Sequence, residues 1–352
     1  MGYDDGWAAL NLEMPRRIPR TEYSVGGHTP LLNAVTGAGL TDDSPPEARA
    51  AAFRELMRIW DFGFCWSVAI GNQYFGTHQT DMGHAEYAEG GSDRRDTVHC
   101  PYREPEDVLA FDPLEALPQL DRADLVQLFE DRYRANCEGY PDAVHMSGTY
   151  TTMFSGFIAL FGWDMLLLAG GVDPEGLGRV AARYEAWIRQ FFEAYAETDI
   201  PVMMVHDDIV WTSGAVFAPD WYRAHIFPAY KRLWQPVLDA GKIIVYTSDG
   251  DYTEFFDDIV DCGARALVME PMCDMAAFAA KYGKTHGFIG NADTRILLSG
   301  DRAAIRAEVE RCVAIGRDCP GFFMAVGNHI PPNTPVENAL YYEEVFDELR
   351  TR

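Results

Sequence analysis

The chain has 352 residues, and 48% of them are hydrophobic, which is ordinary globular composition and enough to bury one large core. Asp and Glu number 54 against 29 Lys and Arg, so the formal net charge is −25. A charge of this sign repels nucleic acid and anionic membranes, which leaves a protein or a small molecule as the expected partner.

Localisation signals and cysteine usage point to one class of protein. We expect no apolar run as long as the roughly 20 residues of a membrane helix, and the start MGYDDGWAAL lacks the basic-then-apolar order of a signal peptide. The seven cysteines are scattered without a CxxC pair, so neither a disulfide framework nor a zinc ribbon is indicated. We therefore predict a cytoplasmic protein with a single domain over residues 1–352.

The N-terminal part contains two strand candidates. Residues 17–24 (RIPRTEYS) and 62–72 (FGFCWSVAIGN) are predicted to be strands, and residues 25–50 between them a loop and a helix start. Residues 71–125 then form a long connection rich in Gly, His and acidic residues. Long loops in compact domains are usually lids or binding loops, so we expect a lid or insertion here.

From residue 140 onward, short β-rich runs alternate with amphipathic stretches, which is typical of repeated βα units with parallel strands. The first run covers 140–148, and helices are expected near 150–168 and 173–197. Five further strands are predicted at 201–208, 242–251, 264–271, 285–293 and 321–332. The helices that alternate with them are expected near 219–240, 252–262, 274–282, 300–316 and 335–350.

These segments add up to eight strands, which predicts an α/β fold of one class. Eight parallel strands with right-handed helical crossovers close into a (β/α)8 TIM barrel, here with an N-terminal extension and a long loop after the second strand. Every helix then lies outside, and the carboxyl ends of all strands lie at one face, where the active sites of this fold are found.

Many polar side chains stand at these predicted strand ends: His206, Asp207, Asp208, Asp249, Asp251, Glu270, Cys273, Asn291, Asp293, Asn328 and His329. Asp251 and Asp293 fit a helix N-cap, because helical segments start soon after each. Asp207 and Glu270 fit that role less well, because each still belongs to its strand. Histidine and carboxylate ligands from different strands suit a divalent metal such as zinc, and structural capping is the alternative.

Aromatic residues are also frequent near the predicted mouth of the barrel: Trp66, Tyr74, Phe75, Tyr150, Phe154 and Trp211. Most of them are expected to pack in the core. A pocket that combines rings with a few polar groups would nevertheless suit an aromatic ligand. Within the lid, His78 and His84 are candidate ligands, substrate contacts or ordinary loop residues.

Five blocks of the chain resemble the uroporphyrinogen decarboxylase superfamily. They are 148–167, 206–214, 246–267, 287–297 and 326–344, and the resemblance extends over about residues 140–350. It implies a barrel, in agreement with the strand count. The superfamily contains both decarboxylases and methyltransferases that serve corrinoid proteins, so the site residues must distinguish the two activities.

Several positions favour the methyltransferase branch. In the decarboxylases a carboxylate ends the second strand and N-terminal arginines hold the acid groups of the substrate. Here Val68 stands at the first position, and no such arginine motif is recognisable. The start RRIPRTEYS (16–24) and the loop DMGHAEYAEGG (81–91) are similar to methyltransferase subunits of corrinoid-dependent O-demethylases.

The resemblance also constrains the metal ligands. Zinc methyltransferases of the superfamily that act on thiols carry a His-x-Cys pair after the fifth strand and a Cys near the last. Here Thr247, Asp249 and Asn328 align with these positions, so thiolate ligation is absent. An oxygen and nitrogen set is implied instead, and we predict zinc ligands at Asp249, Glu270 and His329, with His206 and Cys273 in reserve.

The predicted activity is transfer of a methyl group from a methoxylated aromatic compound to the Co(I) of a corrinoid protein. The zinc would act as a Lewis acid on the leaving oxygen, and His206 or Asp207 would donate a proton or orient the substrate. No DxHxxG corrinoid-binding motif occurs in the chain, so a partner must supply the cobalt. The predicted substrate contacts are His84, Tyr87, Tyr150, Trp211 and Asn291.

Three alternatives stay open on the sequence. The first is a decarboxylase or other lyase of the same superfamily that acts on another acid. The second is methyl transfer from a methylamine, because aromatic cages also bind quaternary amines. The third is a barrel that binds a ligand without catalysis.

Overall fold

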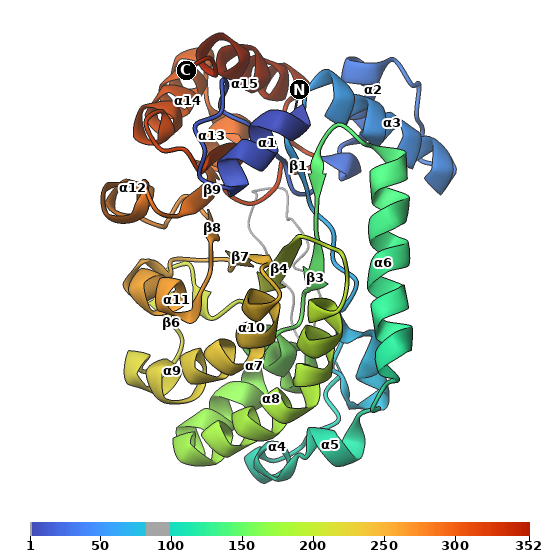
Figure 1. The fold of residues 1–352 in the computed structure, drawn as a ribbon, viewed down its shortest axis with the longest axis vertical. Helices are drawn as coiled ribbons and strands as arrows, with labels where there is room; N and C mark the ends of the chain where they lie inside the picture. The colour runs from blue at the N-terminus through green and yellow to red at the C-terminus, as the bar shows by residue number, and fades with distance from the viewer. Residues whose placement is uncertain (1, 82–98) are drawn as a thin grey trace.

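A computed structural model describes residues 2–81 and 99–352. Its central element is a parallel sheet with the strand order β10-β9-β8-β7-β4-β3. The strands are β3 (Ser147–Thr149), β4 (Val202–His206), β7 (Ile243–Thr247), β8 (Ala266–Met269), β9 (Gly287–Ala292) and β10 (Phe322–Val326). Five of these strands lie within segments predicted to be strands, and β3 overlaps the end of the predicted segment 140–148, so the parallel α/β fold is confirmed (Figure 1).

Shorter strands and single bridges continue this sheet toward a closed barrel. β1 (Phe64–Cys65) pairs in parallel with β2 (Val144–His145), and Ile70 bridges to Thr149 of β3. Residues 19–21 lie between β1 and β10, since the Arg20 carbonyl accepts from the Gly63 N–H and the Thr21 N–H donates to the Met324 carbonyl. The predicted first strand, 17–24, is thus reduced to a short bridging segment, and eight chain segments encircle the core.

The alternation of side chains along the strands separates two apolar clusters. In β4, Val202 and Met204 belong to an inner cluster, whereas Met203 and Val205 belong to an outer cluster that packs against the helices. The inner cluster fills the barrel with the side chains of Ala9, Leu10, Phe64, Val144, Met146, Val202, Met204, Val245, Ala266, Val268, Ile289, Phe323 and Ala325. This two-residue period is the geometry of a strand whose faces are both buried.

Helices surround the sheet as the repeated units require. The predicted helices appear as α7 (Phe154–Val172), α8 (Pro174–Ala196), α9 (Pro219–His225), α10 (Phe227–Asp239), α11 (Phe256–Cys262), α12 (Met275–Tyr282), α14 (Arg302–Gly316) and α15 (Val336–Leu349), with a short α13 (Thr294–Ser299). The expected helix 219–240 is divided in two at Ile226. Between α9 and β4 lies a two-stranded antiparallel ribbon, β5 (Val210–Trp211) and β6 (Gly214–Ala215).

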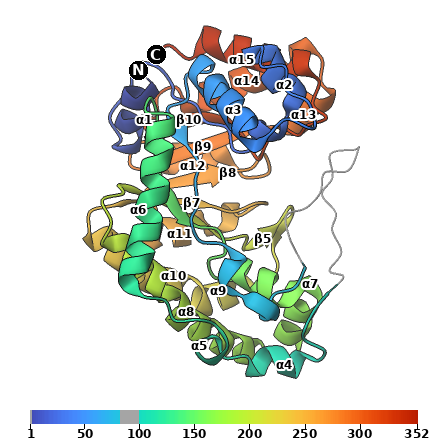
Figure 2. The same cartoon turned by 90° about the vertical axis from the view of Figure 1, so that its right-hand side faces the viewer.

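The N-terminal part and the long connection contain further helices: α1 (Gly2–Leu10), α2 (Thr29–Thr36), α3 (Pro46–Ile59), α4 (Pro105–Ala110), α5 (Pro113–Ala116) and α6 (Arg122–Gly139). The expectation of a long loop over 71–125 was therefore too simple. Two helices there start at a proline that follows an acidic N-cap residue, Glu104-Pro105 and Asp112-Pro113, which is a helix-start signal. Figure 2 shows α6 running along one side of the molecule, from α1 to α5.

One helix corrects the expectation about apolar runs. α7 spans 19 residues and is long and apolar enough, by length and composition, to cross a membrane. Half of its most apolar stretch is buried within the protein, where it packs against α4 and α8. It is also interrupted at Gly162, whose φ of 69° lies in the left-handed region that glycine tolerates. These features are those of a core helix.

The N-terminal helix covers one end of the barrel. α1 packs against β1, β2 and β10, and its Ala9 and Leu10 belong to the inner cluster.

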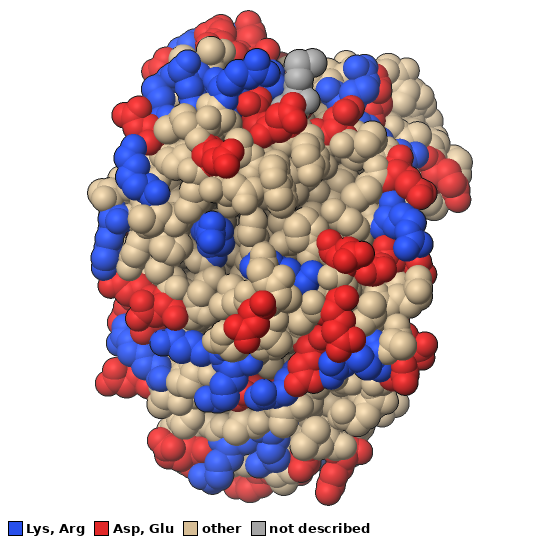
Figure 3. All heavy atoms as spheres, in the orientation of Figure 1, with Lys and Arg blue, Asp and Glu red and all other residues tan. Residues whose placement is uncertain are grey.

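The surface charge is distributed on the face drawn in Figure 3. Acidic and basic side chains are interspersed there, so the excess of negative charge is not gathered into one patch on that face.

The bridging segment 19–21 is held by a buried guanidinium. Arg20 has no exposed surface, and its guanidinium carbon lies 4.4 Å from the ring centre of Trp60 and 5.6 Å from that of Tyr342. The same side chain pairs with Glu22 at 2.9 Å and with Glu343 of α15. A charge can be kept in such a place only because carboxylates and aromatic faces replace its water.

Glu22 connects the buried Arg20 to the last strand, β10. One carboxylate oxygen accepts from the Tyr342 hydroxyl at 2.9 Å, and the other accepts from the Val326 N–H at 3.1 Å. Burial raises the pKa of Glu22, although Arg20 and these hydrogen bonds act in the opposite direction. Arg20 and Glu22 together therefore tie the first segment of the barrel to β10 and α15, which belong to the last unit.

Replacing Arg20 should destabilise the whole fold. We expect Arg20→Met to lower the free energy of unfolding by about 3–5 kcal/mol, because it leaves Glu22 and Glu343 without their partner in a buried place. Urea denaturation followed by circular dichroism measures the loss. The control Arg58→Ala removes an exposed ion pair with Glu55 and should leave the stability nearly unchanged. Equal effects of the two substitutions would contradict the role given to Arg20.

Candidate metal and substrate site

Three side chains from two adjacent strands form a cluster at the carboxyl end of the barrel. His206 ends β4, Asp208 follows it, and Asp249 follows β7. One ligand atom of each lies within 4.8 Å of the others, and His206 Nε2 is 3.2 Å from an Asp208 oxygen. Among the residues described by the structure, this is the grouping of three His, Cys, Asp or Glu side chains that is compact enough to hold a metal ion.

The strand period explains why these residues meet. Because Val202 and Met204 point into the barrel, the same alternation turns His206 and Asp208 inward and Asp207 outward. On β7, inward-facing Val245 places Asp249 on the inner side in the same way. Since β4 and β7 are neighbours in register, with His206 opposite Thr247, the two strand ends bring their side chains together.

The histidine ring is held in a defined orientation. Its Nδ1 lies 2.8 Å from the Tyr150 carbonyl oxygen, and its ring stacks on the Tyr150 ring at 3.8 Å between centroids. A carbonyl oxygen can only accept a hydrogen bond, so Nδ1 carries the proton that it donates, and Nε2 faces the carboxylates. A backbone acceptor behind the second ring nitrogen is the common arrangement for a histidine that binds a metal.

The carboxylates alter the protonation of His206. Burial lowers the pKa of the imidazole, but Asp208, Asp249 and the Tyr150 carbonyl act more strongly together and raise it to about 9. Without a metal, the ring is therefore protonated at neutral pH, and Nε2–H donates to Asp208. A metal at this site would therefore take the place of the proton on Nε2.

The donor set fits a divalent metal. One imidazole nitrogen and two carboxylates match the three-ligand pattern of catalytic zinc sites, in which another position stays open for water or substrate. Oxygen and nitrogen donors without thiolate also suit manganese or iron. His206, Asp208 and Asp249 are thus the residues that could hold the ion, and the donor types alone do not select one metal.

This cluster differs from the predicted zinc set, with which it shares Asp249. Glu270 instead accepts from the Gly250 N–H at 2.6 Å and from the Asn328 side-chain amide at 2.5 Å. Asn328 also reaches Asp249 at 3.4 Å, so the two carboxylates are linked through an amide. His329, on the loop after β10, is half-buried and is not a member of the described cluster.

Of the two residues predicted as reserve ligands, only one belongs to the cluster. His206 belongs to the cluster, whereas the Cys273 thiol is buried and donates to the Gly250 carbonyl at 3.3 Å. Burial raises the pKa of this thiol, which disfavours the thiolate that a metal would need.

Asp207, predicted to be catalytic, faces away from the mouth. Its carboxylate is completely buried and accepts from the Ser155 N–H at 2.6 Å, at the start of α7, and from the Tyr230 hydroxyl. Burial raises its pKa to about 6, against the effect of these donors. Asp207 therefore anchors a helix to the strand, and the side chains of this segment that belong to the cluster at the mouth are His206 and Asp208.

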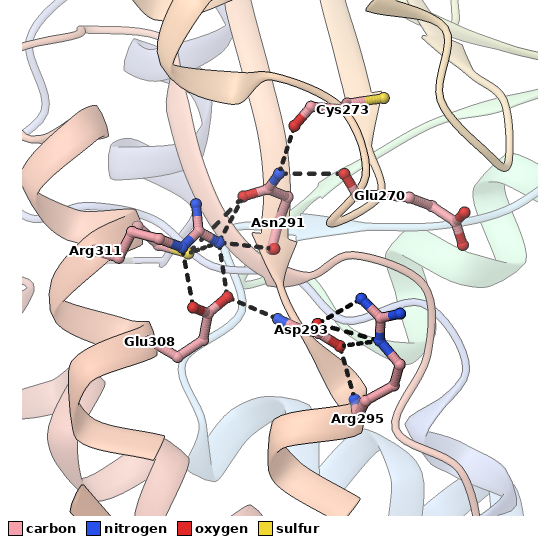
Figure 4. Close-up of polar contacts among 8 residues, drawn as sticks. Glu270, Cys273, Asn291, Asp293, Arg295, Glu308 and Arg311 are labelled. Carbon is pink, nitrogen blue, oxygen red and sulfur yellow. Dashed lines mark hydrogen bonds and ion pairs between the residues drawn. The ribbon is translucent and has the colours of Figure 1, made fainter. Parts of the chain in front are cut away.

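Asn291, predicted to contact substrate, instead connects the loop after β8 to Arg311 of α14. Figure 4 shows its side chain between Arg311 and the backbone of the loop after β8, with the Glu270 carboxylate directed away from it. The Asn291 amide donates to the carbonyls of Glu270 and Cys273, and its oxygen accepts from Arg311 at 3.0 Å. These contacts use both ends of the amide. Asp293 caps α13, as expected.

The other predicted substrate contacts have different positions. Tyr150 lies at the mouth, stacked on His206. Trp211 lies on the β5–β6 ribbon, is 48% exposed and packs edge-on against Trp163. His84 and Tyr87 lie outside the described residues.

Sequence reasoning assigned no role to two residues near the mouth. Asp208 was among the strand-end candidates, and the alternation along β4 would have selected it over Asp207. Tyr23 packs with Trp66 against the inner cluster, with ring centres 4.3 Å apart, where residues 19–21 lead into the mouth. Its only signal was the same inward alternation, which needs the exact strand register.

Comparison with known proteins places the chain in context. The profile of the family described as uroporphyrinogen decarboxylase matches residues 140–349. The uroporphyrinogen decarboxylase of Thermus thermophilus is 28% identical over 46% of this chain and 45% of its own length. That of Pelobacter propionicus is 25% identical over 39% of this chain and 40% of its own. The chain thus spans less than half of the length of these relatives.

A solved structure extends the likeness to the whole fold. The methyltransferase from Methanosarcina mazei superposes with a TM-score of 0.64 and 18% identity, covering 99% of this chain and 98% of the other. The family and this likeness together support the (β/α)8 barrel that the sequence predicts.

Metal binding provides a direct test of the two ligand sets. We expect one Co(II) per chain by calorimetry, and an affinity at least about tenfold weaker in Asp208→Asn, because a charged ligand becomes neutral. Glu270→Gln and the surface control Asp239→Asn should bind as the unchanged protein does. Weakening by Glu270→Gln or His329→Gln, but not by Asp208→Asn, would instead establish the sequence-predicted set.

The raised pKa of His206 makes metal affinity depend on pH. Because the ring holds a proton below about pH 9 in the metal-free protein, a metal must displace that proton in order to bind. Between pH 6 and 8 we expect the dissociation constant for Co(II) to fall about tenfold for each unit of pH increase. A constant affinity between pH 7 and 8 would show that His206 is already neutral or is not a ligand.

Proposed function

The chain belongs to the uroporphyrinogen decarboxylase family, and from that premise we propose that it is a corrinoid-protein-dependent methyltransferase that demethylates methoxylated aromatic compounds. The observation that carries the proposal is the position of the His206–Asp208–Asp249 cluster beside aromatic rings. A Lewis-acid site next to ring faces is suited to an aryl ether, whose ring can stack while its oxygen approaches the metal.

The mouth has two chemically different sides. Tyr23, Trp66 and Tyr150 follow the first three strand positions and pack on the inner cluster. His206, Asp208, Asp249 and Glu270 follow the next strands, β4, β7 and β8. A substrate between the two sides would have its ring on the aromatic side and its reacting group on the polar side.

The same geometry supports methyl transfer over decarboxylation of uroporphyrinogen. Val68, which stands where the decarboxylase carboxylate is expected, packs on the inner cluster. Of the N-terminal arginines, Arg20 is enclosed outside the barrel wall, and Arg17 pairs with Asp5 and Asp61. A substrate that carries many carboxylates would find acidic groups at this mouth and neither of these two guanidinium groups.

The proposed reaction is a displacement at the methyl carbon. The Co(I) of the corrinoid provides the electron pair for the new carbon–cobalt bond, the oxygen–methyl bond breaks, and the phenolate leaves with its electron pair. A metal at the cluster, with zinc as our proposal, would act as a Lewis acid toward that oxygen. Asp208 and Asp249 would hold the ion, and Tyr150 would fix the His206 ring by its carbonyl and its stacked face.

The cobalt must come from a partner in this proposal, since the chain has no DxHxxG motif. A corrinoid protein would dock over the carboxyl end of the barrel, because only there can cobalt reach a methyl group held at the cluster. That arrangement also keeps water away from the reactive Co(I) during transfer.

An assay with a reduced corrinoid protein tests the proposed function. With 1,2-dimethoxybenzene as the methyl donor, we expect the absorption spectrum of methylcobalamin to develop and 2-methoxyphenol to accumulate. Asp208→Asn should lower kcat/KM by about 100-fold or more, since Lewis-acid stabilisation of the leaving oxygen contributes several kcal/mol. The control Asp239→Asn changes an exposed carboxylate at the end of α10 and should keep full activity.

Three results would contradict the proposal. Failure to form methylcobalamin with any member of a panel of methoxyaromatics would remove O-demethylation, and success with a methylamine would replace the donor. Release of CO₂ from an organic acid without a corrinoid protein would instead establish the lyase alternative.

A further inference from the structure

Two hydrogen-bond donors at the mouth are buried without an acceptor. The hydroxyl of Tyr23 and the indole Nε1 of Trp66 are shielded from solvent, and neither has a hydrogen-bond partner within residues 2–81 and 99–352. Buried polar groups in folded proteins nearly always find partners, so such exceptions require an explanation. An indole N–H can only donate, so what Trp66 lacks is an acceptor.

The two side chains form one surface. Their rings lie 4.3 Å apart with an interplanar angle of 38°, and the Trp66 ring contacts Phe64 of the inner cluster edge-on at 5.3 Å. Cys65, between Phe64 and Trp66, belongs to the outer cluster, so strand alternation turns Trp66 into the barrel. Apolar packing therefore holds both rings in place while their polar atoms lack partners.

The surroundings keep Tyr23 in its protonated form. Burial, followed by the charges of Glu22, Asp249 and Glu270, raises its pKa well above the usual value. The influence of Asp249 and Glu270 also shows that this hydroxyl lies within electrostatic reach of the polar side of the mouth. Tyr23 is thus a neutral O–H donor at physiological pH.

We propose that the Tyr23 hydroxyl and the Trp66 indole N–H donate hydrogen bonds to oxygen atoms of the substrate ring, and so position it and select it. The inference rests on the proposed function for the kind of ligand and goes further by naming the required feature, an acceptor oxygen on the ring. A quaternary ammonium ion has no acceptor and would leave both donors unsatisfied. An alkylbenzene of the same shape would do the same.

The specificity arises from the cost of an empty donor. A ligand that brings an acceptor oxygen satisfies a donor that is otherwise unpaired, whereas a ligand without an acceptor leaves the buried N–H or O–H without a hydrogen bond and binds less tightly. Sites built to bond a substrate oxygen therefore reject analogues that lack it. Tyr23 and Trp66 act on binding and orientation, with no proton transfer.

Ligand pairs that differ only in oxygen test this inference without a corrinoid protein. The probes are 1,2-dimethoxybenzene and 1,2-diethylbenzene, in which methylene groups replace the ether oxygens, and binding is followed by intrinsic tryptophan fluorescence. We expect the unchanged protein to prefer the ether by about tenfold or more, and Tyr23→Phe to lose most of that preference. Tyr23→Phe keeps the ring and removes one oxygen atom, so the packing with Trp66 persists.

Two control variants separate this role from others. Tyr282→Phe removes a hydroxyl that donates to Asp257 on the surface and should keep the preference. Ala135→Leu changes the wall of a cavity of about 200 Å³ that α3 and α6 line and that Tyr23 and Trp66 also border. Loss of binding in Ala135→Leu, with the preference intact in Tyr23→Phe, would place the ligand in that cavity and overturn the inference.

The outcome is independent of the proposed function. If Tyr23→Phe demethylates 1,2-dimethoxybenzene with unchanged KM and kcat, the inference fails and the methyltransferase function stands. If the oxygen preference depends on Tyr23 but no methyl transfer is observed, the inference stands and the proposed function fails. Equal affinity of the unchanged protein for ether and hydrocarbon would also overturn the inference.

Discussion

The buried guanidinium of Arg20 is the interaction on which the closed form of the barrel depends. Residues 19–21 contribute only a few backbone hydrogen bonds, to Gly63 on one side and to β10 on the other. Such a short segment cannot remain in place by backbone pairing alone. Arg20 and Glu22 tie it to α15 and β10, so the first and last units of the barrel are joined by charge as well as by the sheet.

Closure at this point also forms the site. Because residues 19–21 are held in the wall, the chain that follows carries Tyr23 inward beside Trp66. One side of the mouth therefore consists of ring faces, and the other consists of the histidine and carboxylates of later units. Each side comes from a different part of the chain, so the two sides face one another only when the barrel closes.

The alternation of side chains along β4 gives adjacent residues of one short segment different roles. His206 and Asp208 point into the mouth, whereas Asp207 between them points outward to α7 and Tyr230. The carboxylate that fixes the strand to its helix is thus adjacent to the two groups that can bind a cation. This arrangement keeps the ligand positions rigid, because the segment that carries them is anchored on its opposite face.

The sequence by itself determined the class of fold, since apolar runs and helical stretches alternate along the chain, which is the pattern of an α/β protein with parallel strands. It also placed His206, Asp249 and Tyr150 near one mouth. Only the tertiary structure decided between Asp207 and Asp208, turned Asn291 toward Arg311, and brought Tyr23 to Trp66. The reason is physical. The pattern of residues along the chain indicates which residues end a strand, but the direction of a side chain depends on strand register and on partners distant in sequence.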